Sequence, residues 1–93
     1  MFQNVKFLLF SEEDQDNNTS NPSLSTLIGL KIRYLRMERN MSQEAFAEVI
    51  GIHRTYLGQI ERAEKNISIR NLEKICKSLK IDPQELFDFS NIL

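Results

Sequence analysis

Signals that start and stop helices dominate the sequence after residue 23. Ser42 and Ser68 suit the N-cap position of a helix, and Asp82 followed by Pro83 is a third start signal. Gly51 supplies the left-handed residue that commonly ends a helix. Between these signals, apolar residues recur with the period of a helix rather than with the alternation of a strand. The pattern predicts an all-α fold of five short helices.

The predicted helices cover residues 24–40, 42–51 and 53–62, and two more begin at residues 68 and 82. One apolar stripe of each helix is expected to face a common core. The residues expected on these stripes are Leu24, Ile28, Ile32, Leu35, Phe46, Ala47, Ile50, Leu57, Ile60, Leu72, Ile75, Cys76 and Leu79. A chain of 93 residues has room for one compact domain.

Residues 1–23 differ in composition from the rest of the chain. Residues 11–23 contain no apolar side chain and are rich in Ser, Asn and Asp, which is typical of a polar linker. Residues 1–10 are apolar and suit a short strand, which could pair with its own copy in a dimer, cover a groove on the domain or remain disordered. We therefore predict an N-terminal extension and linker at residues 1–23 and one folded domain at residues 24–93.

The composition argues against several classes of protein. No apolar run is long enough to span a bilayer, and residues 1–10 make a poor secretory signal, so we expect a cytoplasmic protein. Cys76 and His53 are the only cysteine and histidine, which leaves no disulfide, zinc site or other bound cofactor to expect. No nucleophile set or glycine-rich phosphate loop indicates an enzyme. Cys76 is predicted to be a buried structural thiol.

The net charge of −1 conceals an uneven distribution along the chain. Residues 1–23 hold one basic and four acidic side chains, 1 − 4 = −3. Residues 24–93 hold the remaining 11 basic and 9 acidic side chains, 11 − 9 = +2. The predicted domain is mildly basic, which favours a nucleic-acid partner only where the basic residues share one face.

Residues 42–62 match a helix-turn-helix, in which two short helices are joined by a tight turn. The second helix of such a unit can enter the major groove of DNA. Spacing alone does not establish this function, because helical hairpins in other bundles have the same form. The side chains themselves must distinguish the two interpretations.

Four segments carry a specific resemblance, and they follow one another in a fixed order. They are Ser42-Gln43-Glu44-Ala45-Phe46-Ala47 with Gly51-Ile52, Arg54-Thr55-Tyr56-Leu57, Ile60-Glu61-Arg62, and Asn66-Ile67-Ser68-Ile69. In these segments the chain resembles the repressor-type (Cro/C1-like, XRE) helix-turn-helix family of phage repressors and bacterial regulators, over about residues 26–88. The second segment, with residues 61–62 and 66–69, is similar to the controller proteins of restriction–modification systems. The resemblance implies a five-helix, repressor-like DNA-binding domain.

Four residues of the second helix are candidates for reading bases. Arg54 lies in its first turn, where a guanidinium fork can reach O6 and N7 of guanine. Thr55 offers a hydroxyl and a methyl group, and Tyr56 a phenolic hydroxyl and a stacking face, although both could instead be structural. Gln59 lies one turn after Thr55 on the same face.

A second set of residues is expected at the DNA backbone, around the first turns of the helices that begin at 42 and 68. The family places a glutamine such as Gln43 against the sugar-phosphate chain, and helix N-termini attract phosphates. Ser68 has a competing role as a helix cap. The full set of candidates is Gln43, Arg62, Lys65, Asn66, Ser68, Arg70 and Asn71.

The resemblance also implies structural roles. Arg36 and Glu61 match positions that commonly form an ion pair, which explains an acidic residue inside the DNA-facing unit. Ala63 stands where the family often has glycine, and Gly58 is expected to lower the stability of its helix. His53 is expected to start a helix rather than to act as a pH switch.

One reading helix contacts few base pairs, so specific regulation usually requires a dimer. Apolar residues at the end of the chain provide a candidate interface: Leu86, Phe87, Phe89, Ile92 and Leu93. The core could instead claim Leu86, which leaves Phe87, Phe89 and the tail as the better candidates. We predict a homodimeric regulator on a near-palindromic DNA operator, with RNA polymerase as a further candidate partner. The alternative is an antitoxin or adaptor whose main partner is a protein held by residues 1–10, with DNA binding secondary.

Overall fold

A computed structural model of the chain describes residues 22–93. Five helices follow in order: α3 (Leu24–Glu38), α4 (Gln43–Ile50), α5 (Arg54–Glu61), α6 (Ile69–Leu79) and α7 (Pro83–Leu86). Within these residues there is no strand, so the predicted all-α fold of five short helices is confirmed. None of the helices in this part of the chain is long and apolar enough to cross a membrane. The strand considered in residues 1–10 and most of the predicted linker lie outside the described residues.

Each helix begins at a residue whose side chain accepts a hydrogen bond from an N–H group of the first turn. Such a cap satisfies one of the N–H groups that have no partner within the helix. The capping residues are Ser23, Ser42, His53, Ser68 and Asp82. In His53 the acceptor is Nδ1, 3.1 Å from the backbone nitrogen of Thr55, so this residue starts a helix as predicted.

The helix ends are less regular than the helix starts. Gly51 ends α4 in the left-handed conformation with φ 86°. Asn40, Ala63 and Lys80 adopt the same conformation after α3, α5 and α6, with φ values of 55°, 60° and 56°. After α5, the N–H of Ala63 donates to Ile60 O at 3.0 Å and that of Glu64 to Gln59 O at 2.8 Å. These two bonds form a Schellman turn, so the tight turn after α5 forms without a glycine.

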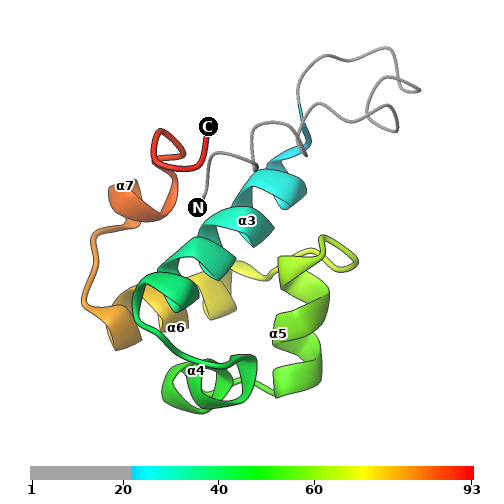
Figure 1. Cartoon of the computed structure of the whole chain (residues 1–93), viewed down its shortest axis with the longest axis vertical. Helices are drawn as coiled ribbons and strands as arrows, with labels where there is room; N and C mark the ends of the chain where they lie inside the picture. The colour runs from blue at the N-terminus through cyan, green and yellow to red at the C-terminus, as the bar shows by residue number, and fades with distance from the viewer. Residues whose placement is uncertain (1–21) are drawn as a thin grey trace.

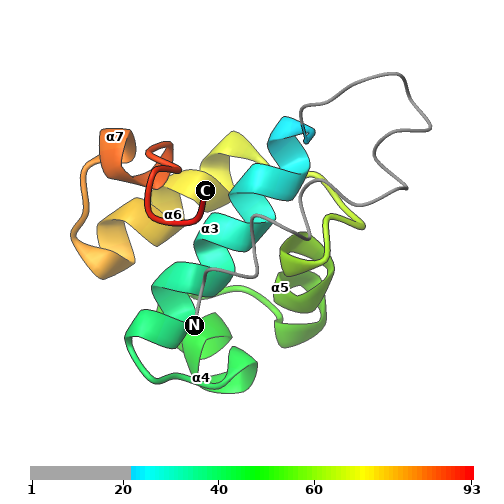
Figure 2. The same cartoon turned by 45° about the horizontal axis from the view of Figure 1, so that its top comes forward.

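The helices are arranged around α3, which runs through the middle of the molecule with α5 and α7 on opposite sides (Figures 1 and 2). Helix α4 packs against α5 and α6, and α6 packs against α7. Buried side chains from all five helices form one core: Ile28, Ile32, Leu35, Phe46, Ala47, Ile50, Leu57, Ile60, Ile75 and Leu86. The core fixes α5 between α3 and α4, which positions the surface described below.

Helices α3 and α5 approach each other at Gly29. A Cβ atom on Gly29 would lie 2.4 Å from the carbonyl oxygen of Ile60 and 3.0 Å from that of Glu61. Both atoms belong to the backbone of α5 and cannot rotate away. Glycine is therefore required for this distance between the two helices, a constraint that the sequence pattern did not reveal.

The C-terminal residues fold back onto α3 through a buried lysine. The side chain of Lys31 is 1% exposed, and its Nζ donates to the carbonyl oxygen of Asp88 at 2.8 Å and to Oδ1 of Asn91 at 3.0 Å. Two side chains predicted for a dimer surface, Leu86 and Ile92, are only 1% and 2% exposed. The prediction of a surface position is therefore wrong for Ile92, whereas Leu86 belongs to the core, the alternative that the sequence left open.

Candidate nucleic-acid interface

A turn centred on Gly51 joins α4 and α5. The N–H groups of Gly51 and Ile52 both donate to the carbonyl oxygen of Ala47, at 2.8 and 3.0 Å, which closes the end of α4. Ile52 packs against the core. Nζ of Lys74 on α6 donates to the carbonyl oxygen of Gly51 at 3.3 Å. Hydrogen bonds from α4 and α6 thus hold the turn, and the apolar residues of α5 face the core.

The outer side of α5 carries the four residues predicted to read bases. Arg54 is the first residue of the helix, and its side chain is 65% exposed. Thr55 is also exposed, whereas Tyr56 and Gln59 are partly buried. Arg54 and Thr55 thus lie at the start of the second helix, where a side chain reaches the major groove in helix-turn-helix proteins.

A polar hollow of about 400 Å³ lies between the first turns of α4 and α5. Its walls bring together four predicted DNA-contacting residues with two others: Gln43, Arg54, Thr55 and Arg62, and Glu44 and Gly58. A Cβ atom on Gly58 would lie 3.1 Å from Nη1 of Arg62. Glycine at this position therefore leaves space for the Arg62 side chain to fold back over α5.

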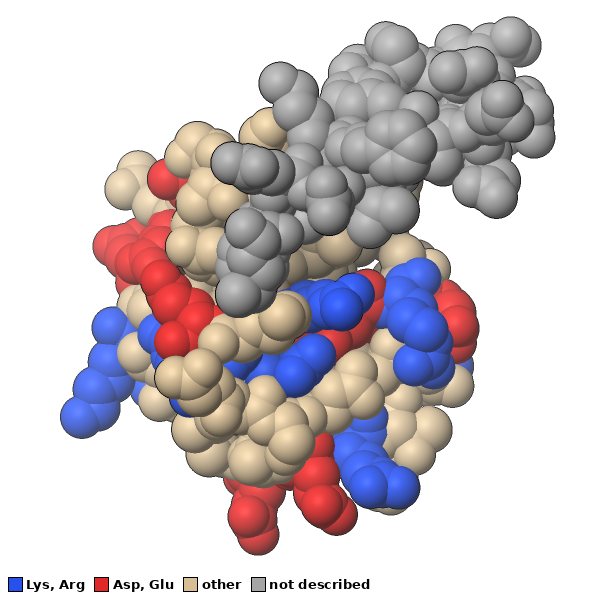
Figure 3. Space-filling view, viewed as in Figure 1, with Lys and Arg blue, Asp and Glu red and all other residues tan. Residues whose placement is uncertain are grey.

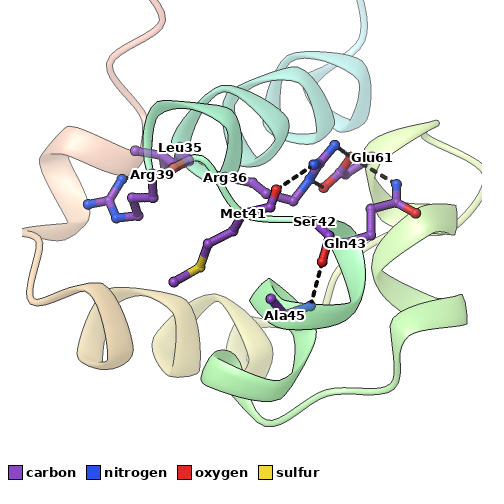
Figure 4. Close-up of polar contacts among 8 residues, drawn as sticks. All are labelled: Leu35, Arg36, Arg39, Met41, Ser42, Gln43, Ala45 and Glu61. Carbon is purple, nitrogen blue, oxygen red and sulfur yellow. Dashed lines mark hydrogen bonds and ion pairs between the residues drawn. The ribbon is translucent and has the colours of Figure 1, made fainter.

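The predicted pair of Arg36 and Glu61 is present and connects α3 with α5 (Figure 4). Nε and Nη2 of Arg36 donate to the two carboxylate oxygens of Glu61, at 2.7 and 3.0 Å. Nη1 of Arg36 donates to the carbonyl oxygen of Met41 at 2.9 Å, which holds the loop between α3 and α4. The Glu61 side chain is only 3% exposed, so its negative charge is directed into the protein and away from the surface of α5.

Gln43 completes this cluster. Its Nε2 donates to Oε1 of Glu61 at 3.1 Å (Figure 4). One of the two side-chain N–H donors of Gln43 is therefore engaged, and as the first residue of α4 Gln43 also has a backbone N–H without a partner in the helix. The cluster thus joins α3, α4 and α5 through hydrogen bonds to one buried carboxylate.

Each of the two arginines that line the polar hollow lies close to a glutamate, and the sequence did not predict either pair. Nη1 of Arg54 lies 3.6 Å from Oε2 of Glu44, and both side chains are largely exposed. Nε and Nη2 of Arg62 donate to the carboxylate of Glu64 at 2.7 and 3.2 Å. The bonds from Arg62 lower the pKa of Glu64, and the bonds from Glu64 raise the pKa of Arg62. Figure 3 shows basic side chains on the α5 side of the molecule with acidic side chains close to them.

The predicted backbone contacts around α6 do not form one cluster. The hydroxyl of Ser68 caps α6 by accepting from the N–H of Asn71 at 3.1 Å. Nδ2 of Asn71 donates to the hydroxyl of Tyr56 at 3.3 Å, which joins the start of α6 to α5. Oδ1 of Asn66 accepts from the hydroxyl of Ser25. Arg70 is exposed beside these residues.

Lys65 and Asn66 line a second hollow of about 300 Å³, whose other walls are mainly apolar. Those walls include Leu24, Ile28 and Leu72. Lys65 and Asn66 therefore do not line the polar hollow between α4 and α5.

Cys76 lies in the wall of a third, apolar groove between α6 and α7. The groove has a volume of about 600 Å³, and Ile69, Leu72, Ile81 and Phe87 also line it. Cys76 is less buried than the sequence predicted, because its exposure is intermediate. Burial, and secondarily the charge of Asp82, raise the pKa of its thiol. Among residues 22–93 no group of side chains is arranged to hold a metal ion.

Comparisons with known proteins agree with this geometry. The helix-turn-helix family (HTH_3) matches residues 32–86. The control protein C.BamHI of Bacillus amyloliquefaciens is 44% identical over 71 residues, which cover 75% of this chain and 88% of that protein. The control protein C.MunI of Mycoplasma sp is 47% identical over 60 residues, or 63% and 81% of the two chains.

A solved structure gives the same result for the fold. The restriction–modification controller protein C.AhdI of Aeromonas hydrophila superposes with a TM-score of 0.64 at 38% identity, covering 68% of this chain and 96% of C.AhdI. The chain therefore belongs to the helix-turn-helix family of DNA-binding transcriptional regulators, and within it to the group of the restriction–modification controller proteins.

Proposed function

We propose that this regulator acts in the cytoplasm as a homodimer on a near-palindromic operator, through which it controls a restriction–modification locus. The observation that carries the proposal is the exposed guanidinium of Arg54 at the first position of α5. Repression or recruitment of RNA polymerase at the operator would give the transcriptional effect. Residues 24–93 would form the domain for DNA binding and dimerisation, preceded by the extension at residues 1–23.

Base readout is assigned to one side of α5. Arg54 would donate from its two terminal nitrogens to O6 and N7 of a guanine. Thr55 and Gln59 would contact neighbouring base edges, and Tyr56 would be held in place by its hydrogen bond with Asn71. Because α5 is fixed at both ends, by its cap at His53 and by the ion pair at Glu61, these side chains would meet the bases with little reorganisation.

The backbone contacts would flank this helix. The backbone N–H of Gln43 at the start of α4 and the side chain of Arg62 share the polar hollow, so both could meet phosphates on one side of the groove. Contacts by Lys65, Asn66, Ser68, Arg70 and Asn71 would come from the turn before α6 and from its first residues.

A second copy is the proposed occupant of the apolar groove between α6 and α7. Ile69 is 83% exposed and Phe87 44% exposed at its rim, and Leu93 is 48% exposed. Monomeric proteins rarely leave large apolar side chains exposed next to such a groove. Two copies joined here would offer two α5 helices to half-sites about 34 Å apart.

Selection from randomised duplexes tests the proposal directly. Enrichment of a site with two-fold symmetry is expected, and enrichment of no symmetric site would exclude an operator-binding dimer. An antitoxin or adaptor would instead retain a protein partner as its main ligand, with DNA binding secondary to it.

Two substitutions separate readout from backbone contact. Arg54→Ala is expected to cost about 1–3 kcal/mol of operator binding and to relax the preference at one base position. Lys65→Ala is expected to weaken all duplexes alike and to reduce the salt dependence of binding. Arg33→Ala is the control, since Arg33 is exposed on α3 and lines none of the three hollows described above. Equal losses on every duplex for Arg54→Ala and Lys65→Ala would contradict this division of roles.

A further inference from the structure

Arg62 has one edge of its guanidinium occupied by Glu64. Nε lies 2.7 Å from one carboxylate oxygen and Nη2 lies 3.2 Å from the other. The two side chains are 56% and 53% exposed, so both can be reached from solvent. The rest of the guanidinium folds over Gly58 and lines the polar hollow. The occupied edge therefore belongs to an arginine on the proposed DNA-facing surface.

The turn after α5 produces this pairing. Ala63 adopts φ 60°, and the N–H of Glu64 donates to the carbonyl oxygen of Gln59 at 2.8 Å. These constraints fix the backbone of Glu64 against the end of α5, two residues beyond Arg62. The carboxylate is held near the guanidinium by the fold of the main chain, which reduces the conformational entropy lost in forming the pair.

A carboxylate and a phosphodiester group offer the same chemistry to arginine. Each presents two oxygen atoms that accept a pair of parallel hydrogen bonds from one guanidinium edge. The Nε–Nη2 edge can serve only one of them. A phosphate must either displace Glu64 or bind the remaining nitrogen, and in both cases the negative charge of Glu64 stays close to the negative charge of the DNA.

We infer that Glu64 competes with DNA phosphate for Arg62 and thereby lowers the affinity of the protein for every duplex. The inference rests on the proposed contact between Arg62 and the DNA backbone. An exposed ion pair is weak, so DNA can displace the carboxylate. Because phosphate contacts carry no sequence information, Glu64 sets the protein concentration at which the operator is occupied without changing which bases Arg54 prefers.

Glu64→Gln in the full chain tests this inference. Binding is measured by fluorescence anisotropy on the operator and on a scrambled duplex of equal length. We expect binding about two- to five-fold tighter on both duplexes at low salt, as exposed ion pairs allow, with the difference shrinking as salt is added. The control is Glu38→Gln, which removes the same charge from a side chain that is 51% exposed and 3.4 Å from Arg39 at the end of α3.

Arg62→Ala separates the failure of this inference from the failure of the proposed interface. It should weaken both duplexes, and in its presence Glu64→Gln should tighten binding no more than Glu38→Gln does. If Arg62→Ala leaves binding unchanged, the assignment of Arg62 to the DNA contact is wrong, and the inference falls with it. If Arg62→Ala weakens binding but Glu64→Gln weakens it as well, or matches Glu38→Gln, the competition by Glu64 is refuted and the interface stands.

Discussion

At the scale of single residues, three helix ends within residues 22–93 place a residue other than glycine in the left-handed conformation. Asn40, Ala63 and Lys80 have φ values between 55° and 60°. This conformation brings Cβ close to the following carbonyl oxygen, which costs an L-residue roughly 1–2 kcal/mol. Asparagine tolerates the conformation better than alanine does, because its side chain can form local hydrogen bonds. Ala63 is therefore a position of local strain next to the proposed interface.

Ala63→Gly is expected to stabilise the protein. Glycine removes the steric cost at φ 60° but adds conformational entropy to the unfolded chain, so the net gain should be about 0.5–1 kcal/mol. Thermal unfolding followed by circular dichroism would show a higher Tm. Ala45→Gly, at an exposed position inside α4, is the matched control and should lower the Tm. A decrease in both variants would contradict the strain at Ala63.

Individual residues differ in how far the sequence could predict them. The pairing of Arg36 with Glu61 and the exposure of Arg54 followed from motif positions, because those positions have a fixed relation to the helices. The roles of Lys31 and Glu64 did not follow, because each depends on a turn or a tail whose path is set by tertiary structure. No periodic pattern in the sequence marks Lys31 as buried, because its hydrogen-bond acceptors are a carbonyl and an amide oxygen near the end of the chain.

At the scale of helices, the contact between α3 and α5 determines where the reading helix lies. Gly29 permits the carbonyl oxygens of Ile60 and Glu61 to approach α3, and Arg36, farther along α3, forms its ion pair with the side chain of the same Glu61. The start of every helix carried a capping residue. The ends of α5 and α6, which Ala63 and Lys80 follow, were not marked by glycine, so helix starts were predictable more directly than helix ends.

Gly29→Ala tests this contact by the sign of its effect. On an open helix the substitution should raise stability by up to about 1 kcal/mol, because alanine is the better helix former. Here the added Cβ would meet the backbone of α5, so we expect a loss of about 1–3 kcal/mol in the free energy of unfolding. Denaturant titration measures this value, with Arg33→Ala on the exposed side of α3 as a control that should change little. A stabilised Gly29→Ala variant would show that α3 and α5 are not in close contact.

At the scale of the whole molecule, the surface of α5 and the apolar groove between α6 and α7 are separate, so DNA and a second copy could be bound together. The sequence predicted a dimer surface at the end of the chain from its apolar composition. The fold uses Leu86 and Ile92 internally and leaves Phe87 and Leu93 of the predicted set exposed, together with Ile69 of α6. Composition alone could not show which of these side chains are buried in the core and which are exposed, because apolar side chains of the core and of an interface are chemically alike.

Replacement of Ile69 and Phe87 by serine should therefore dissociate the proposed dimer without unfolding the domain, since both side chains are exposed in one chain. Sedimentation equilibrium should show a shift to monomer, and operator affinity should fall at least ten-fold, because one reading helix then binds alone. Val49→Ser is the control, because Val49 is 47% exposed on α4 and does not line the groove.

The rate at which Cys76 is alkylated measures the exposure of the groove between α6 and α7, and the experiment needs no DNA. Burial raises the pKa of this thiol, so its reaction should be slow at neutral pH and faster in mild alkali, where more thiolate forms. If two copies meet at the groove, the rate at fixed pH should fall as protein concentration rises, because the second copy covers Cys76. In the double serine variant the rate should not depend on concentration. A wild-type rate that is also independent of concentration, across a range where sedimentation shows dimers, would place the dimer interface elsewhere on the molecule.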